Sequence, residues 1–350
     1  MKNILVTASK SYSVFIGNGL LKEAGKYISQ IKRNATVAVI SDSHVFPIYG
    51  NTLLTSLKDA GLSAISFVFP AGEDSKTPGT YLQILNFLAE NQLTRSDLII
   101  ALGGGVTGDM AGFAAATYLR GISFVQIPTS LLAMVDSSVG GKTAIDLPAG
   151  KNLVGAFYQP DLVLCDMDTL DTLPPDVFLD GCAEVIKYAV LYDAYLFETL
   201  LNHGTDFPRE DVIARCVSLK RDVVAEDEHD NGARQKLNLG HTIGHGIEGC
   251  SNFSISHGKA VAIGMNIVAK AGNQIGITTG HTKEQIENIL HRFGLPTASP
   301  YPAKQLYSFA LSDKKRSANQ INLIIPETIG SCIIRKTPIH QLESFIQAGL

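Results

Sequence analysis

The stretch of sequence that decides the fold is Asp97 to Gly112, which reads DLIIALGGGVTGDMAG. Its first part, Leu98 to Leu102, is an unbroken apolar run of the kind that forms a buried parallel strand. The run ends in glycines, of which Gly103, Gly105 and Gly108 match the pattern G-x-G-x-x-G. Such glycines permit a tight turn and let backbone N–H groups approach a pyrophosphate at a helix N-terminus. The stretch therefore predicts a strand, a turn and a helix, with either a nucleotide site or a plain glycine turn at the junction.

An acidic residue is expected about twenty positions after such a turn, to bind the ribose, but Arg120 and Gly121 stand there. Asp42 is a candidate replacement, because it follows the apolar run Thr36 to Ile40. A carboxylate at the carboxyl end of a parallel strand can accept hydrogen bonds from ribose hydroxyls. Capping of the next helix is an equally good interpretation of Asp42.

The first half of the chain alternates strands with helices, which predicts a parallel sheet. We expect strands at 3–8, 12–16, 36–40, 63–69, 98–102, 123–127 and 162–165, and helices at 20–31, 45–60, 77–92 and after the glycine turn. Helical patterns then dominate, at 175–192, 211–225, 236–249, 258–271 and 283–293, before strands at 320–325 and 331–335 and a helix at 338–347. The predicted fold class is α/β, with a Rossmann-like parallel-sheet domain in residues 1–170, a mainly α-helical domain in residues 171–350, and a cleft between them.

Composition narrows the function classes. The 350 residues are 45% hydrophobic, which is enough to bury the cores of two domains. The formal net charge is −4 and the 29 Lys and Arg residues are scattered, so neither nucleic acid nor a membrane surface is an expected partner. No apolar stretch is long enough to span a bilayer, and the N-terminus lacks the hydrophobic core of a signal peptide. The 5 cysteines are widely spaced and form no C-x-x-C pair, which fits a reducing, cytoplasmic location.

Residues 136–143, DSSVGGKT, form a segment rich in groups that bind anions. They resemble a phosphate-binding P-loop, but the pattern G-x-x-x-x-G-K-[ST] requires glycine where Asp136 stands, so an NTPase is rejected. Lys142, with Lys151 and Asn152 nearby, still offers donors to an anionic substrate. Ordinary solvated loop charges are the alternative interpretation.

The helical half carries residues that favour a metal site. Glu184 and Lys187 lie three positions apart in the apolar segment GCAEVIKY, on one face of the expected helix. His241 and His245 are one helical turn apart, a spacing that can hold a divalent metal, and His257 stands at the start of another expected helix. Each histidine alone would be an ordinary core or capping residue. Three of them with a buried glutamate favour a site for zinc or a similar divalent ion.

Further cations follow in the chain, namely Lys220, Arg234 and the run Lys314 to Arg316. Several cations around one carboxylate-and-histidine site favour a substrate that bears phosphate, carboxylate or both. For the last three residues, an exposed basic turn is an equal alternative.

Several long blocks resemble the signature segments of the 3-dehydroquinate synthase family. They read GGGVTGDMAGFAAATYLRG, IPTSLLAMVDSSVGGKTAIDLPAGKNLVGAFYQP, DGCAEVIKY, LNLGHTIGHGIE and SHGKAVAIGM, in the family's order. The resemblance implies a carbon–oxygen lyase that converts 3-deoxy-D-arabino-heptulosonate 7-phosphate into 3-dehydroquinate and phosphate, in the shikimate pathway to chorismate and aromatic amino acids. It also implies NAD⁺, which is regenerated in each turnover, and one divalent metal, Zn²⁺ or Co²⁺.

The resemblance implies roles for individual residues as well. It places the metal ligands at Glu184, His241 and His257, and makes His245 a substrate-side polar or proton-transfer residue. It assigns NAD⁺ contacts to Asp42, Ala71, Gly72, Glu73, Asp74, Ser75, Lys76, Gly105, Val106, Thr107, Gly108, Asp109, Thr129, Ser130, Lys142, Lys151, Thr169, Leu170, Asp171 and Thr172. It assigns substrate contacts or catalysis to Arg120, Asp136, Lys142, Lys151, Asn152, Lys187, Lys220, Arg234, His245 and Lys314. In this family Arg120 can reach across a dimer interface, so we expect a homodimer.

Two positions depart from the family pattern, because Asp230 stands where glutamate is common and His44 is not expected beside Asp42. Two other activities remain alternatives. A sibling sugar phosphate cyclase would make another product, although the intact block GGKTAIDLPAGKN favours the dehydroquinate branch. A metal- and NAD-dependent polyol dehydrogenase would accumulate NADH and would not need this many cations.

Overall fold

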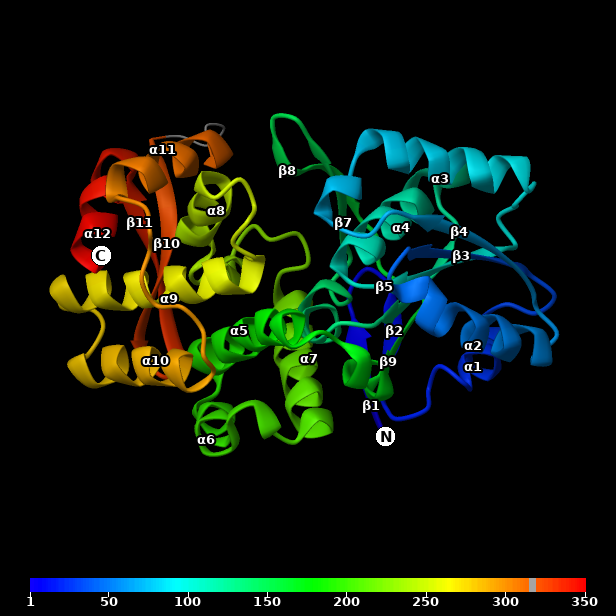
Figure 1. Ribbon diagram of the computed structural model, residues 1–350, viewed down its shortest axis with the longest axis horizontal. Coiled ribbons are helices and arrows are strands. Elements are labelled where there is room, and N and C mark those ends of the chain that lie inside the picture. Colours follow the sequence, from blue (N-terminus) through cyan, green and yellow to red (C-terminus); the bar gives the residue numbers. More distant parts are fainter. Residues whose placement is uncertain (315–318) are drawn as a thin grey trace. The chain divides into compact units, whose positions relative to one another are not determined.

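The structure is a computed structural model that describes residues 1–314 and 319–350, with side chains described for residues 1–309 and 319–350. The chain forms two compact units (Figure 1). Unit 1 comprises Met1–Pro174 and Cys216–His229, and unit 2 comprises Pro175–Arg215 and Asp230–Leu350. Among the described residues, no helix combines the length and the apolar character that a bilayer span requires.

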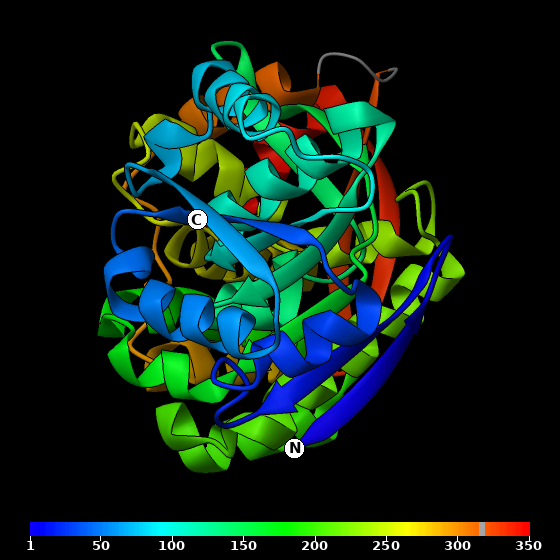
Figure 2. The ribbon, with the colours of Figure 1, turned by 90° about the vertical axis from the view of Figure 1, so that its right-hand side faces the viewer.

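Unit 1 is built on a seven-stranded sheet in the order β1-β2-β9-β6-β5-β3-β4. The strands are β1 (Lys2–Thr7), β2 (Ser11–Gly17), β3 (Thr36–Asp42), β4 (Ser63–Phe69), β5 (Leu98–Gly103), β6 (Ser123–Pro128) and β9 (Leu162–Asp166). All neighbouring strands are parallel except β1, which pairs antiparallel with β2 and is seen in dark blue in Figure 2. The predicted Rossmann-like parallel sheet is confirmed.

Helices cover both faces of this sheet, which explains the unbroken apolar runs of its central strands. Val37 and Val39 of β3 belong to one core, which they share with α1 (Ala24–Ile31) and α2 (Val45–Asp59). Ala38 and Ile40 belong to the opposite core, which they share with α3 (Pro78–Glu90) and α4 (Gly105–Thr117). Alternate residues of one strand therefore pack against different helix layers, and the strand needs no polar face.

The order of the strands around β3 creates a position suited to a ligand. After β3 the chain adds β4 at the edge of the sheet and then places β5 on the other side of β3. The carboxyl ends of β3 and β5 therefore flank the point at which the strand order reverses. In open parallel sheets, ligands bind in the crevice beside such a point.

Unit 2 is mainly helical and is arranged around α9 (His257–Gln274), shown in yellow in Figure 1. Helix α9 packs against α5 (Pro175–Tyr192), α8 (His241–Cys250), α10 (Gly280–Arg292) and α12 (Leu342–Gly349). Helices α6 (Ala194–His203) and α11 (Ala303–Lys314) and the antiparallel pair β10 (Gln320–Thr328) and β11 (Ser331–Pro338) also belong to this unit. Helix α7 (Arg209–Glu226) begins in unit 2 and belongs to unit 1 from Cys216 onward.

One predicted helix is wrong in its extent. Instead of a single helix over 236–249, the chain forms a 3-10 turn, η6 (Ala233–Asn238), and then α8. Gly240 separates them in the left-handed conformation, with φ of 79°, and a Cβ there would lie 2.7 Å from the carbonyl oxygen of Val261 in α9. The glycine therefore both breaks the helix and lets α9 approach.

Other boundaries also differ from those expected. Residues 20–23 form turns, so α1 begins at Ala24, and α12 begins at Leu342 after a 3-10 turn. Helices α6 and α11 were not expected. The segment 136–143 continues into a hairpin, β7 (Lys142–Leu147) and β8 (Gly150–Phe157), whose two strands form a sheet of their own. Most of β8 is exposed, which is why no buried-strand pattern marks it.

Candidate functional site

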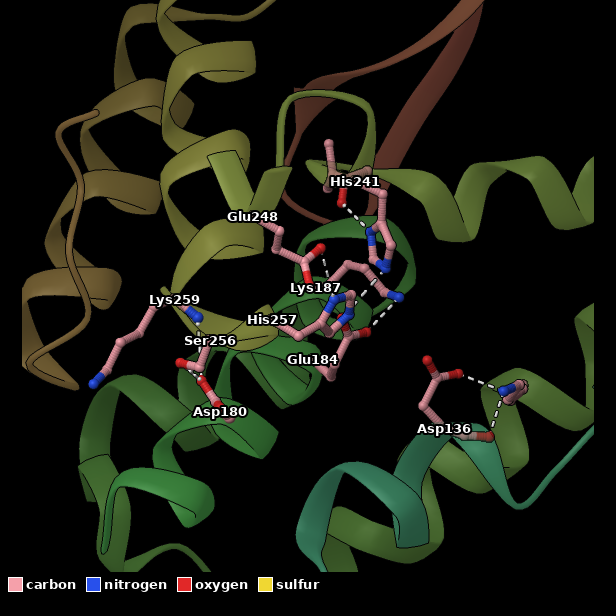
Figure 3. Close-up of polar contacts among 11 residues, drawn as sticks. Asp136, Asp180, Glu184, Lys187, His241, Glu248, Ser256, His257 and Lys259 are labelled. Atoms are coloured by element: carbon pink, nitrogen blue, oxygen red, sulfur yellow. Dashed lines mark hydrogen bonds and ion pairs between the residues drawn. The ribbon is translucent and has the colours of Figure 1, made fainter. Parts of the chain in front are cut away.

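Three side chains of unit 2 meet in one cluster (Figure 3). Glu184 lies in the middle of α5, whereas His241 and His257 are the first residues of α8 and α9. One carboxylate oxygen and one ring nitrogen of each histidine lie within 4.8 Å of one another. Three helices thus bring three ligand atoms to one place.

The spacing of these atoms fits the ligands of a shared divalent ion. Nε2 of His241 lies 3.5 Å from Oε1 of Glu184, and Nε2 of His257 lies 3.4 Å from the same oxygen. Zinc bonds to nitrogen and oxygen are about 2.0–2.2 Å long, so tetrahedral geometry separates neighbouring ligand atoms by about 3.3–3.6 Å. The separations of both ring nitrogens from the carboxylate oxygen therefore fit ligands of one divalent ion.

The other nitrogen of each ring has a partner of its own. Nδ1 of His241 lies 3.1 Å from the carbonyl oxygen of Leu239, and Nδ1 of His257 lies 3.4 Å from Oε2 of Glu248. Both partners are acceptors, so each Nδ1 carries the proton. Metal-binding histidines ordinarily show this arrangement, which leaves the lone pair of Nε2 facing the ion.

Charge at the cluster favours a cation. Burial, and then the charge of Lys187, lower the pKa of His241 to about 3, so this ring is neutral. Burial also opposes protonation of His257, but its hydrogen bonds to Glu184 and Glu248 outweigh burial and raise the pKa of His257 to about 10. Two carboxylates facing one ring therefore attract a positive charge, which a proton or a metal ion can supply.

Lys187 balances the buried carboxylate ligand. It lies one helical turn after Glu184 on α5, and both side chains are buried. Its ammonium group pairs with Oε2 of Glu184, whereas the histidines face Oε1. A buried carboxylate needs such a partner to remain ionised, and this pairing leaves one oxygen directed at the histidines.

A second contact between α5 and α9 fixes the start of α9 (Figure 3). Oδ1 of Asp180 accepts hydrogen bonds from the Ser256 hydroxyl at 2.6 Å and from the Lys259 N–H at 3.2 Å. Ser256 precedes α9 but does not cap it with its own side chain, so Asp180 caps α9 from the neighbouring helix. Gly258 permits the approach, because a Cβ there would lie 2.4 Å from Cα of Asp180. Helix α5 therefore carries one ligand and also positions the turn that bears another.

In unit 1, the predicted NAD⁺ residues other than Lys142 and Lys151 follow the carboxyl ends of five parallel strands. Asp42 ends β3, residues 71–76 follow β4, Gly105 to Asp109 follow β5, and Thr129 and Ser130 follow β6. Thr169 to Thr172 lie in a 3-10 turn, η4 (Met167–Thr172), after β9. Because parallel strands end at the same edge of a sheet, these segments share one side of unit 1.

Side chains connect several of these segments. The N–H of Ala71 donates to the hydroxyl of Ser43 at 3.0 Å, which joins the loops after β4 and β3. The hydroxyl of Tyr49, in α2, donates to the carbonyl oxygen of Thr169 at 3.2 Å. The edge of the sheet is therefore a connected surface.

Asp42 interacts in two directions. Its Oδ1 accepts hydrogen bonds from the N–H groups of His44 at 2.9 Å and Val45 at 3.0 Å, so Asp42 binds the start of α2, although the N-cap residue of that helix is His44. Its Oδ2 accepts one from the Thr107 hydroxyl at 3.3 Å, in the first turn of α4. The carboxylate thus joins the ends of β3 and β5 at the reversal of strand order.

Close packing accounts for two of the three motif glycines. A Cβ at Gly103 would lie 2.5 Å from Oγ1 of Thr107, and one at Gly108 would lie 2.7 Å from Oε1 of Gln126. Gly105 is the first residue of α4, where backbone N–H groups lack helical partners. The turn therefore combines tight packing with donors suited to an anion.

Lys76 joins two of the predicted groups of residues. Its Nζ lies 2.6 Å from Oδ2 of Asp109 and 2.5 Å from Oδ1 of Asn152. Lys76 is buried, which opposes its charge, but Asp109 and Glu73 outweigh burial and raise the pKa of Lys76. The structure thus brings predicted NAD⁺ residues to the predicted substrate residue Asn152, in β8.

The other predicted substrate residues of unit 1 lie in several places. Lys220 of α7 pairs with Asp136, which lies in a π-helical turn, η3 (Ala133–Ser137). Nζ of Lys151 lies 3.5 Å from Oε1 of Glu73. Lys142 begins β7, and Arg120 has a positive φ of 65° in a 3-10 turn.

In unit 2, Arg234 is almost fully buried in η6. His245 lies one turn after His241, with 5.7 Å between ring centroids. Asp230, which departs from the family pattern, has a positive φ of 60°. Lys314 ends α11, but its side chain, like Lys315 and Arg316, lies outside the described residues.

Two residues at the cluster were not singled out from the sequence. Glu248 lies seven positions after His241 on α8, a spacing that places both on one helix face and that a search for carboxylates could have used. Asp180 carries no sequence signal, because its role depends on the packing of α5 against α9.

Two family models match consecutive parts of this chain. Residues 66–180 match the family model described as 3-dehydroquinate synthase N-terminal, and residues 181–316 match the one described as 3-dehydroquinate synthase C-terminal. A 3-dehydroquinate synthase of Streptococcus suis is 43% identical over 354 residues, which cover 99% of this chain and 100% of the relative.

Solved structures are similar along the whole chain. A 2-deoxy-scyllo-inosose synthase complexed with carbaglucose-6-phosphate, NAD⁺ and Co²⁺ has a TM-score of 0.91 at 25% identity and covers 100% of both chains. A 2-epi-5-epi-valiolone synthase from Streptomyces hygroscopicus, with NAD⁺ and Zn²⁺ bound, has a TM-score of 0.89 at 24% identity and covers 99% of this chain and 98% of that one. The chain belongs to the 3-dehydroquinate synthase family.

Proposed function

We propose that this chain converts 3-deoxy-D-arabino-heptulosonate 7-phosphate into 3-dehydroquinate and phosphate, as a homodimer in the cytoplasm. The observation that carries the proposal is the cluster of Glu184, His241 and His257 in a chain that matches the family along its length. The reaction requires oxidation of a substrate hydroxyl, loss of phosphate, reduction, ring opening and aldol closure. It is a step of the shikimate pathway.

We assign one divalent metal, Zn²⁺ or Co²⁺, to Glu184, His241 and His257. The ligand spacing and the direction of both Nε2 lone pairs support this assignment, and the related inosose synthase contains Co²⁺. When bound, the ion acts as a Lewis acid that lowers the pKa of substrate hydroxyls and orients them. Lys187 keeps the carboxylate ligand charged, and we assign it a second role in binding negative groups of the substrate.

We assign NAD⁺ to the carboxyl edge of the sheet in unit 1, at Asp42, residues 71–76, 105–109, 129–130 and 169–172, with Lys142 and Lys151. When bound, NAD⁺ takes a hydride from the substrate and later returns it. Asp42 accepts hydrogen bonds from ribose hydroxyls, and the first turn of α4 donates N–H groups to the pyrophosphate. The reversal of strand order between β3 and β5 supports this position.

We assign binding of the substrate to charged and polar residues of both units, among which the cations recognise its carboxylate and phosphate, including Arg120 from the second subunit of a dimer. The assigned residues are Arg120, Asp136, Lys142, Lys151, Asn152, Lys187, Lys220, Arg234, His245 and Lys314. Asp136 orients Lys220, because it accepts hydrogen bonds from that ammonium group through its side chain and its carbonyl oxygen. His245 transfers or shares a proton with the substrate.

The test is phosphate release from the heptulosonate phosphate at an NAD⁺ concentration far below that of substrate, with and without a chelator. We expect many turnovers per NAD⁺, no net NADH, and loss of activity with the chelator. Glu184→Ala and His257→Ala should each lose both metal and turnover, because three protein ligands leave no redundancy. His281→Ala, an exposed histidine in α10, is the matched control that should retain both.

Three outcomes would contradict parts of the proposal. Accumulation of NADH would indicate a polyol dehydrogenase. A carbocycle other than 3-dehydroquinate would indicate a sibling cyclase. If His257→Ala kept its metal while His245→Ala lost it, the ligand assignment would be wrong.

A further inference from the structure

Helix α8 presents three titratable side chains on one face. His241, His245 and Glu248 are spaced by four and three residues, so they follow one another along α8. Glu248 is only 3% exposed, and its Oε2 lies 3.4 Å from Nδ1 of His257 (Figure 3). The proposed reaction gives Glu248 no direct part, so its burial against a ligand ring calls for another role.

The geometry of the His257 ring excludes that Glu248 binds the same metal ion as Nε2 of this ring. The two ring nitrogens point in different directions, with Nε2 toward Glu184 and Nδ1 toward Glu248. One ion cannot use both nitrogens of the same ring. If the metal binds Nε2, Glu248 faces the opposite nitrogen and cannot share that metal through this ring.

A competing arrangement does exist, because His245, Glu248 and His257 also offer ligand atoms within 4.8 Å of one another. That group would use Nδ1 of His257 and leave Nε2 facing Glu184 without an ion. It also omits His241, whose Nδ1 contact with Leu239 directs Nε2 at Glu184. The cluster of Glu184, His241 and His257 therefore accounts for more of the observed contacts, because it includes both rings whose Nε2 faces Glu184.

We propose that Glu248 is a positioning residue that accepts the Nδ1 proton of His257 and thereby fixes the tautomer and orientation in which Nε2 binds the metal. This inference rests on the proposed metal site. A carboxylate behind a ligand imidazole also makes the ring a stronger donor, because its negative charge polarises the N–H bond. Asp180 restrains the backbone beside His257, whereas Glu248 restrains the ring itself.

The experiment measures Zn²⁺ affinity by competition with a chromophoric chelator, in the full chain without substrate. Removal of such a partner commonly weakens metal binding by about 10–100-fold. We expect Glu248→Ala to raise the Zn²⁺ dissociation constant by about this factor. Glu248→Gln keeps an acceptor but loses the charge, so its effect should be smaller. Glu287→Gln, which removes a carboxylate paired with Lys270 elsewhere in unit 2, should leave the affinity unchanged.

The visible spectrum of Co²⁺-loaded protein separates positioning from direct ligation. Glu248→Gln should give the same Co²⁺ spectrum as the unaltered protein, because the ligands of the ion stay the same. Loss of a ligand would change that spectrum. If Glu248→Gln changed the Co²⁺ spectrum in the same way as Glu184→Ala does, the inference would be wrong. It would also be wrong if Glu248→Ala and Glu248→Gln both left the Zn²⁺ affinity unchanged. If Glu184→Ala itself left Zn²⁺ affinity unchanged, the proposed metal site would fail instead. Glu248→Gln carries the test if Glu248→Ala does not fold.

Discussion

Gly258 is the position at which the contact between α5 and α9 can be tested most directly. A Cβ at this residue would lie 2.4 Å from both Cα and the carbonyl oxygen of Asp180, whereas ordinary contact begins near 3.4 Å. In Gly258→Ala the two backbones must therefore separate by about 1 Å. The hydrogen bond from Lys259 to Asp180 is already 3.2 Å long, so this shift breaks it.

The size of the effect follows from three contributions to the free energy of unfolding. Overpacking against backbone costs about 1–3 kcal/mol, and the lost capping hydrogen bond costs about 1 kcal/mol. Replacement of glycine by alanine returns about 0.4–1 kcal/mol through the unfolded state. Gly258→Ala should therefore destabilise unit 2 by about 1–3 kcal/mol and, by moving His257, weaken Zn²⁺ binding by about tenfold or more.

The assay is thermal unfolding of the metal-free protein together with Zn²⁺ affinity by chelator competition. Gly280→Ala is the matched control, because Gly280 is also in the first turn of a helix of unit 2 and a Cβ added there would meet nothing within 4 Å. The control should show a Tm and affinity equal to or slightly above those of the unaltered chain. Equal behaviour of the two variants would refute the reasoning.

Three further predictions concern single carboxylates. Hydrogen bonds from Thr94 and the Thr36 N–H outweigh desolvation and hold the pKa of Asp97 below its usual range, so Asp97→Asn should destabilise the protein at pH 7. The difference in the free energy of unfolding between the two proteins should shrink as the pH falls below about 4, because the carboxyl group then binds a proton in the unfolded chain. A difference that does not depend on pH in denaturant unfolding would contradict this prediction. Asp193 caps α6 and pairs with Arg215, so Asp193→Ala should cost about 1–3 kcal/mol in thermal unfolding, while Asp193→Asn retains the cap and should lose less. Asp42→Asn should keep the fold but raise the NAD⁺ dissociation constant by about tenfold or more in calorimetric titration, and unchanged affinity would remove Asp42 from the site.

The sheet of unit 1 was predictable because burial on two faces leaves a strong local signal. Leu98 to Leu102 and Thr36 to Ile40 are short apolar runs bounded by turn residues, and both are central strands. The hairpin of β7 and β8 lacked this signal, because β8 is mostly exposed and its pairing partner is only β7. Patterns in sequence thus report burial, and they miss strands that packing does not bury.

At the metal cluster, the sequence indicates which residue types bind the metal, but it does not indicate which ligands group together or which residues position them. The helical spacing of His241 and His245 alone pointed to a ligand pair, whereas the structure groups His241 with His257 and Glu184. The separation of ligands across three helices depends on how these helices pack, which spacing within one helix cannot report. The same holds for Asp180, whose partners lie 76 and 79 positions further along the chain.

The composition of unit 1 has a consequence for the order in which the protein can fold. The segment Cys216–His229 belongs to this unit, although it follows the first stretch of unit 2 in the chain. Through Glu228 it accepts hydrogen bonds from Ser9 at 2.6 Å and Gln159 at 2.8 Å. During synthesis, Cys216 is added 50 positions after the last strand of the sheet ends at Asp166, which takes about 2.5–10 s at ordinary elongation rates, so unit 1 can be completed only after this delay. A chain that ends at Pro174 contains the sequence of all seven strands of the sheet but lacks the segment Cys216–His229 that completes unit 1.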